Sequence, residues 1–264
     1  MSFRRWVSAF PAYGFLQGFA REFLGNIVAC GPVPQHIAFI MDGNRRFAQN
    51  NGLELGEGHV AGFESLSNIL EILYNLGVYA VTVYAFSIEN FNRPEHEIES
   101  LFNIIRSKLL LISEKDAIPH RYGVSVRFIG NRELIPEDII VLIENLEDAT
   151  KDMTRGILNI AFPYTSRDDM AQAIRNIVSD AETKDLDPTA IDEPLYERTM
   201  YTGQSPPLDI MVRTSGETRL SDYMIWQSCD NCSVEFIPTL WPDINSWDAF
   251  KIIFKWSYKM YKQK

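Results

Sequence analysis

Residues Asp42 to Arg46 place a carboxylate, a glycine, an amide and two guanidinium groups in direct succession. They follow five unbroken apolar residues, Ile37–Met41, a run typical of a strand buried on both faces of a parallel sheet. Gly43 allows a tight turn with close ligand approach, and Asn44 can cap the next helix. Ligands of open α/β sheets bind at the carboxyl ends of strands, and arginines beside a helix N-terminus suit phosphate. The pattern therefore predicts an anion site.

A carboxylate is unexpected in an anion site, because an unpaired Asp42 would repel a bound diphosphate. A bridging Mg²⁺ removes the conflict, since Mg²⁺ typically takes one or two carboxylates plus substrate phosphate oxygens. The alternative is a buried Asp that pairs with a neighbouring arginine for structural reasons. From the residues alone, both interpretations stay open.

A second polar cluster follows Val81–Phe86, which is predicted to be another buried strand. Ser87, Asn90 and Arg93 come directly after this predicted strand. Side chains capable of chemistry thus follow two separate strands, which favours a shared site at one edge of a sheet.

Together with a third stretch, Arg213–Asp222, these motifs resemble the cis-prenyltransferases, the undecaprenyl and dehydrodolichyl diphosphate synthases. The resemblance runs from about His36 to Asp243, with the motifs in the same order. Three parts are most similar to the eukaryotic dehydrodolichyl branch: Arg45 with Phe47, the sequence Phe86–Phe91, and the sequence Arg213–Asp222.

The resemblance implies condensation of isopentenyl diphosphate with an allylic diphosphate, expected to be farnesyl diphosphate, to give a long-chain polyprenyl diphosphate, the dolichol precursor for protein glycosylation. Asp42 would hold Mg²⁺, with Glu235 as a second metal ligand; a surface or capping role for Glu235 is the alternative. Isopentenyl diphosphate would bind at Arg213, Arg219 and Ser221. The expected allylic diphosphate site comprises Asp42, Gly43, Asn44, Arg45, Arg46, Phe47, His59, Ser87, Phe91 and Arg93.

Asp42, Asn44 and Asn90 are the expected catalytic residues by the same resemblance. Amides are poor bases, so we interpret the two asparagines as groups that position the reacting ends, and diphosphate or water as possible proton acceptors. A phosphohydrolase with Asp42 as nucleophile would need a second carboxylate two residues on, where Asn44 stands. A non-catalytic subunit would lack the motif that this chain keeps whole.

Three positions depart from the bacterial members of the family. Leu55 replaces a basic residue, and Arg45 replaces a glycine. The sequence Lys259–Lys264 lacks the Arg-x-Gly that reaches a neighbouring active site in homodimeric relatives. This difference leads to the expectation of a homologous, non-catalytic partner of the Nogo-B receptor type.

Strand-like and helical runs alternate along the chain, which predicts a single α/β domain with a mostly parallel central sheet flanked by helices. The resemblance adds an elongated apolar tunnel walled by the helices at 60–76 and 95–115. Further strands are expected at 124–129, 157–162, 208–212 and 234–236, and further helices at 137–150, 168–181 and 247–261. The expected division is an N-terminal segment, 1–30, and a catalytic domain, 31–264.

Net charge, the cysteines and the N-terminal segment indicate which kinds of partner the chain could bind. A net charge of −10 argues against a nucleic-acid binder. Cys229 and Cys232 have zinc-knuckle spacing without a second Cys/His pair, so ordinary thiols are favoured over a metal. The aromatic segment 1–30 is too interrupted to span a bilayer and fits either an interfacial helix or a helix packed on the domain. The resemblance implies peripheral association with the cytoplasmic face of the endoplasmic reticulum membrane.

Overall fold

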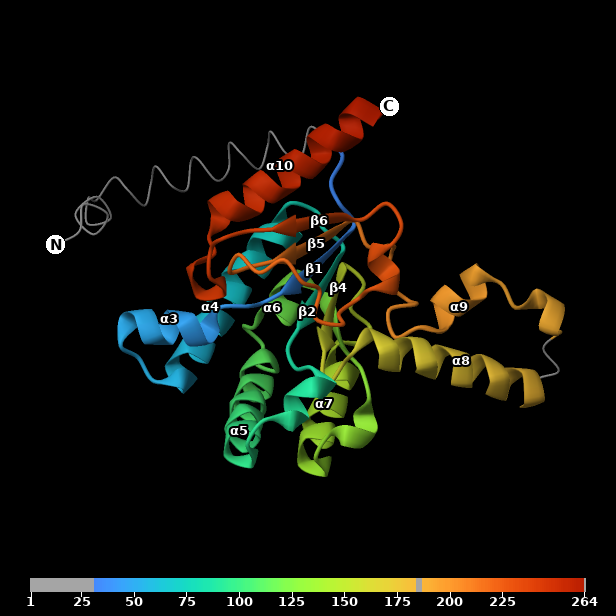
Figure 1. The fold of residues 1–264 in the computed structure, drawn as a ribbon, viewed down its shortest axis with the longest axis horizontal. Helices are drawn as coiled ribbons and strands as arrows, with labels where there is room; N and C mark the ends of the chain where they lie inside the picture. Colours follow the sequence, from blue (N-terminus) through green and yellow to red (C-terminus); the bar gives the residue numbers. More distant parts are fainter. Residues whose placement is uncertain (1–30, 184–186, 264) are drawn as a thin grey trace.

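The central sheet has six strands, all parallel, in the order β3-β4-β2-β1-β5-β6 (Figure 1). The computed structural model describes residues 31–183 and 187–263. This architecture confirms the predicted single α/β domain with a parallel sheet. The strands are β1 (His36–Ile40), β2 (Ala80–Tyr84), β3 (Val124–Ile129), β4 (Gly156–Ala161), β5 (Ile210–Arg213) and β6 (Ser233–Phe236).

Helices connect the strands close to their predicted places. One difference is at the start of the predicted helix at 60–76, which begins earlier because Glu54 and Glu57 form a reciprocal capping box there. The helices are α3 (Asn44–Asn51), α4 (Leu55–Asn75), α5 (Glu95–Ile112), α6 (Ile118–Tyr122), α7 (Glu137–Thr150), α8 (Ser166–Thr183), α9 (Glu193–Thr199) and α10 (Ser246–Gln263). The N-terminal segment 1–30 lies outside the described residues.

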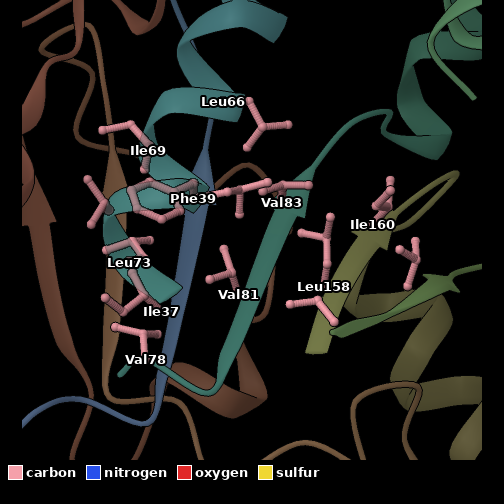
Figure 2. Packing of buried hydrophobic residues seen from close by; sticks show 14 of the residues in the cluster. Ile37, Phe39, Leu66, Ile69, Leu73, Val78, Val81, Val83, Leu158 and Ile160 are labelled. Carbon is pink, nitrogen blue, oxygen red and sulfur yellow. The ribbon is translucent and has the colours of Figure 1, made fainter. Parts of the chain in front are cut away.

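Alternating residues of β1 enter two separate cores, as the two-residue period of a strand requires. Ile37 and Phe39 pack under α4, which contributes Leu66, Ile69 and Leu73 to this face of the sheet (Figure 2). Ala38 and Ile40 pack on the opposite face with Tyr164, Tyr223 and Met224. Every residue of β1 is therefore buried, which explains the unbroken apolar run.

The strand order brings distant motifs together. The chain leaves β1 toward β2 on one side, while β5 lies on the other, so the sheet has a switch point at β1. Such points leave a crevice at the carboxyl ends of the strands. The segments after β1, β2 and β5, which carry the three motifs, share this edge.

None of the helices within residues 31–183 and 187–263 combines the length and apolarity needed to cross a bilayer.

Candidate active site

Asp42 and Arg213 form an ion pair at the carboxyl ends of β1 and β5. The Arg213 Nη2 donates a hydrogen bond to Asp42 Oδ2 at 2.8 Å. Thr214 fixes the backbone between the two strands: its Oγ1 donates to the Asp42 carbonyl at 2.6 Å and accepts from the Asp42 N–H at 2.9 Å. The carboxylate is held two residues beyond Ile40, the β1 partner of Arg213 in the sheet register.

The environment keeps Asp42 ionised. Burial alone would raise the pKa of its carboxyl, but the hydrogen bond and charge of Arg213, with smaller contributions from Ser215 and Arg46, lower that pKa below its usual value. Asp42 is therefore an anion at neutral pH, as a magnesium ligand must be.

Arg213 is buried and uses its donors on two further groups. Its Nη1 donates to the Arg219 carbonyl at 2.5 Å and to Ser221 Oγ at 2.7 Å. Its Nε has no hydrogen-bond partner among the described residues. A buried guanidinium with an unused donor at the edge of a cavity is suited to an anionic ligand. The structure thus brings together all three residues predicted to bind isopentenyl diphosphate.

Gly43 and Asn44 make the turn into α3, but Asn44 does not cap that helix as the sequence suggested. The cap position is Gly43, with φ of 113°, and a Cβ there would meet Leu240 at about 3 Å. Asn44 is the first helical residue, and its amide nitrogen donates only a long bond of 3.4 Å to the Met41 carbonyl. Its Oδ1 is buried and has no partner among the described residues. This oxygen faces Gly62 of α4.

Two glycines of α4 allow the approach of α4 to Asn44, and the sequence analysis missed them. A Cβ on Gly58 would lie 2.5 Å from the Asn44 carbonyl, and one on Gly62 would lie 2.3 Å from Asn44 Oδ1. Trp241 also donates its indole N–H to the Gly62 carbonyl at 2.8 Å. The four-residue spacing of the glycines in a helix is the signal that could have revealed this contact.

The remaining cations are arranged around acidic residues. Arg46 Nη2 donates to Ser215 Oγ at 2.5 Å and lies 3.6 Å from Glu217. Glu217 also pairs with Arg219. Glu97, which was not predicted, lies 3.6 Å from Arg45 and 3.4 Å from Arg93.

His59 lies in this cationic part of the site. Burial lowers the pKa of its imidazole, and the charges of Arg93 and Arg45 lower it further, while Glu97 opposes them. His59 is therefore neutral at pH 7 and can donate one hydrogen bond without adding charge.

The turn after β2 is fixed by its own side chains. Ser87 Oγ accepts from the Glu89 N–H at 3.1 Å, and Asn90 Oδ1 accepts from the Ser87 N–H at 3.0 Å. Because the Asn90 carbonyl oxygen is used in this turn, a positioning role fits Asn90 better than proton abstraction.

A cavity of about 740 Å³ extends from these polar groups between α4, α5 and the sheet. The polar end includes Asp42, His59 and Arg213. The deep end is apolar and is lined by Phe63, Leu66, Val83, Leu101, Ile104, Ile105, Leu109, Ile112, Phe128, Ile160 and Phe162. The cavity therefore suits a ligand with an anionic head group and an apolar tail.

Three predicted residues do not reach this cavity. Phe47 is absent from the lining, and Phe91 packs edge-on against Phe86 and Phe102 instead. Glu235 lies on β6, two strands from β1, and its carboxylate accepts from Lys255 of α10 at 2.7 Å. The placement of Glu235 does not support it as a second ligand beside Asp42 within one chain.

A metal at this site would depend on the substrate for ligands. Among the described residues, no group of three or more His, Cys, Asp or Glu side chains could hold a metal ion. Mg²⁺ is satisfied by one or two carboxylates with substrate phosphate oxygens. The ionised Asp42 carboxylate at the polar end of the cavity meets that requirement, so the residues present fit Mg²⁺.

Comparison with known proteins assigns the chain to a family. The family model described as putative undecaprenyl diphosphate synthase matches residues 40–263. The chain belongs to this family. It is a prenyltransferase of the polyprenyl diphosphate synthase type, and it elongates prenyl chains in cis toward dolichol precursors.

Curated relatives come from several kingdoms of life. The human dehydrodolichyl diphosphate synthase complex subunit DHDDS is 44% identical over 88% of this chain and 69% of its own length. The complex subunit SPAC4D7.04c of Schizosaccharomyces pombe is 39% identical, with 88% of each protein covered. A geranylgeranyl-diphosphate-specific tritrans,polycis-undecaprenyl-diphosphate synthase of Methanopyrus kandleri is 40% identical over 94% of this chain and 89% of its own.

A solved structure agrees with the fold. Lavandulyl diphosphate synthase from Lavandula x intermedia, in complex with dimethylallyl diphosphate, is similar with a TM-score of 0.77 at 28% identity. The similarity covers 85% of this chain and 95% of the plant chain.

Proposed function

We propose that the cavity holds two diphosphates side by side, the allylic one toward Arg45, Arg46 and His59 and the isopentenyl one toward Arg213, Arg219 and Ser221. The observation that carries this proposal is the Asp42–Arg213 pair at the mouth of an apolar cavity. Asp42 lies between the two sets of cations, and the apolar end accepts the growing chain.

The proposed allylic site combines two positively charged arginines with one neutral histidine. Arg45 and Arg46 are exposed on the first turn of α3, and the neutral imidazole of His59 adds a hydrogen-bond donor. Departure of the leaving group builds negative charge on diphosphate oxygens, which donors already in place stabilise.

The isopentenyl side depends on a preorganised guanidinium. Arg213 is locked by Asp42, the Arg219 carbonyl and Ser221, so little conformational freedom is lost when it binds an anion. The unused Nε of Arg213 and the exposed guanidinium of Arg219 supply donors.

Mg²⁺, when bound with substrate, would neutralise diphosphate charge and so assist departure of the leaving group. Asp42 would hold it. Asn44 and Asn90 position the reacting ends, and the proton lost in condensation goes to diphosphate or water.

A partner subunit and a membrane surface complete the proposal. The human and yeast relatives are named as complex subunits, which supports a heteromer of this chain with a homologous, non-catalytic subunit of the Nogo-B receptor type. Residues 1–30 would bind the cytoplasmic face of the endoplasmic reticulum membrane. Deletion of residues 1–25 should then reduce flotation with vesicles but spare single-turnover condensation.

The test is condensation by the purified chain, alone and with such a partner, supplied with labelled isopentenyl diphosphate, farnesyl diphosphate and Mg²⁺. We expect label in long polyprenyl diphosphates, with a higher rate when the partner is present. Release of inorganic phosphate without chain growth would favour the phosphohydrolase instead.

A further inference from the structure

Arg167 connects two loops that approach the active site from different strands. It is the second residue of α8, and its Nη2 donates to Glu89 Oε1 at 2.6 Å. Its Nε donates to Asp222 Oδ2 at 2.7 Å, and its backbone N–H donates to Asp222 Oδ1 at 3.3 Å. One residue thus joins the turn after β2 to the loop after β5.

Both loops carry residues of the proposed substrate sites. Glu89 lines the cavity beside Ser87 and Asn90. Asp222 directly follows Ser221, whose hydroxyl accepts the hydrogen bond from Arg213. Arg167 itself does not line the cavity, so any effect on substrate must pass through these neighbours.

The loop after β5 has an unfavourable backbone that requires external support. Ser221, Asp222 and Met224 have φ of 51°, 55° and 44°, in the left-handed region that side chains other than glycine rarely adopt. Such conformations persist where the surroundings impose them.

The first turn of α8 imposes this conformation. The Ser166 N–H donates to the Asp222 carbonyl at 2.7 Å, and Ser166 Oγ accepts from the Ile225 N–H at 2.8 Å. Together with the bidentate hold of Arg167 on Asp222, these bonds fix the segment on both sides of Met224. Ser221 is thereby kept where it can accept from Arg213.

Arg167 also balances charge near the anion site. Glu89 and Asp222 are two carboxylates beside a cavity proposed to bind diphosphate, and the Asp222 side chain is only 10% exposed. Without Arg167, their negative charge would oppose an incoming diphosphate.

We propose that Arg167 is a positioning residue for isopentenyl diphosphate: it clamps Asp222 to Glu89, and so holds the Ser221 loop that orients Arg213. The inference rests on the proposed function and adds to it a residue outside the cavity. The Arg167 side chain is 70% exposed, and exposed ion pairs contribute little to stability. The clamp therefore acts on binding more than on folding.

Separate KM values test the clamp. Arg167→Gln should raise the KM for isopentenyl diphosphate about three- to tenfold and the KM for the allylic substrate by a smaller factor, because Ser221 follows the Asp222 contact while the allylic side is affected only by the charge of Glu89. The melting temperature should change little. Arg167→Lys should give a smaller rise, because lysine keeps the charge but loses the planar fork that holds Asp222.

Arg175→Gln is the matched control. Arg175 lies on the same helix two turns later, and its guanidinium donates to Gln172 Oε1 at 3.0 and 2.8 Å. Removing its charge should leave both KM values unchanged. The double variant Arg167→Gln with Asp222→Asn should be no worse than the more affected single variant, because both remove one interaction.

Equal rises of both KM values in Arg167→Gln, no rise at all, or additive effects in the double variant would each show that Arg167 is only a structural residue. These outcomes differ from failure of the proposed function, in which the unmodified chain itself forms no elongated product. In that case, titration with inorganic diphosphate still tests the role of Arg167. If Arg167 positions the site, Arg167→Gln should bind diphosphate more weakly than Arg175→Gln does.

Discussion

The carboxylate of Asp42 accepts a hydrogen bond from the buried guanidinium of Arg213 at 2.8 Å, although the two residues are 171 positions apart in the chain. The pairing of β1 with β5 produces this contact. Asp42 was interpreted either as a magnesium ligand or as the structural partner of an arginine. The two interpretations are compatible, since Asp42 pairs with Arg213 and also lines the cavity proposed to bind the diphosphates. The same contact makes the two proposed substrate sites neighbours.

Lysine replacements should distinguish the two sites. Arg213→Lys and Arg219→Lys keep the charge but lose bidentate donation, so we expect a larger rise in the KM for isopentenyl diphosphate than for the allylic substrate. The rise should be greater for Arg213, which is buried and holds three acceptors, than for the exposed Arg219. Equal losses for both substrates would contradict the division into two sites.

The buried imidazole of His36 should make the stability of the protein depend on pH. His36 is the first residue of β1, at the end of the strand away from Asp42. Burial lowers the pKa of its imidazole to about 4, although a hydrogen bond to the Pro206 carbonyl opposes this shift. The unfolded chain, with a pKa of about 6.5, binds a proton before the folded chain does. The stabilisation is therefore fully present above pH 6.5 and is lost as pH falls toward 4, by about 3 kcal/mol in total.

A difference measurement isolates this effect, because Asp169 acts in the opposite sense. Burial raises the pKa of its carboxyl to about 6, so its contribution to stability decreases as pH rises from about 4 to 6. The free energy of unfolding of the native chain minus that of His36→Gln should fall between pH 6.5 and 4. The exposed His96→Gln is the control, and a flat difference for His36→Gln would refute the assignment.

Lys108 should influence product length. Its Nζ lies 4.5 Å from the centre of the Phe63 ring, across α4 and α5, and it is a charged residue among the apolar groups of the deep cavity. Lys108→Leu removes this polar group and should shift products to longer chains while total isopentenyl incorporation stays similar. Lys115→Leu, an exposed lysine beyond the end of α5, should leave the chain-length distribution unchanged. An unaltered distribution in Lys108→Leu would count against a role for Lys108.

Local patterns predicted most of the framework. The apolar runs located β1 and β2, and the α7 bounds agree with the predicted helix at 137–150. The motif residues converge because all three motifs follow strands, and the carboxyl ends of parallel strands meet at one edge.

Contacts that depend on side-chain direction could not be predicted in this way. Glu235 was expected near the metal, yet the alternation along β6 directs it to Lys255 of α10. Arg167 was missed because its partners are 78 and 55 residues away and belong to no common sequence motif. The fit of Gly62 against Asn44 depends on how α3 and α4 pack, which periodicity does not specify.

Turnover of Asp42→Asn with saturating isopentenyl diphosphate, allylic diphosphate and Mg²⁺ is the most direct measurement of the proposed site. Asparagine keeps the shape of the side chain but loses the charge that offsets the metal and Arg213, so the melting temperature serves as a control for folding. We expect turnover to fall by about 10²- to 10³-fold in a folded protein. Turnover within about twofold of the unmodified chain would contradict the role of Asp42 on which the account depends.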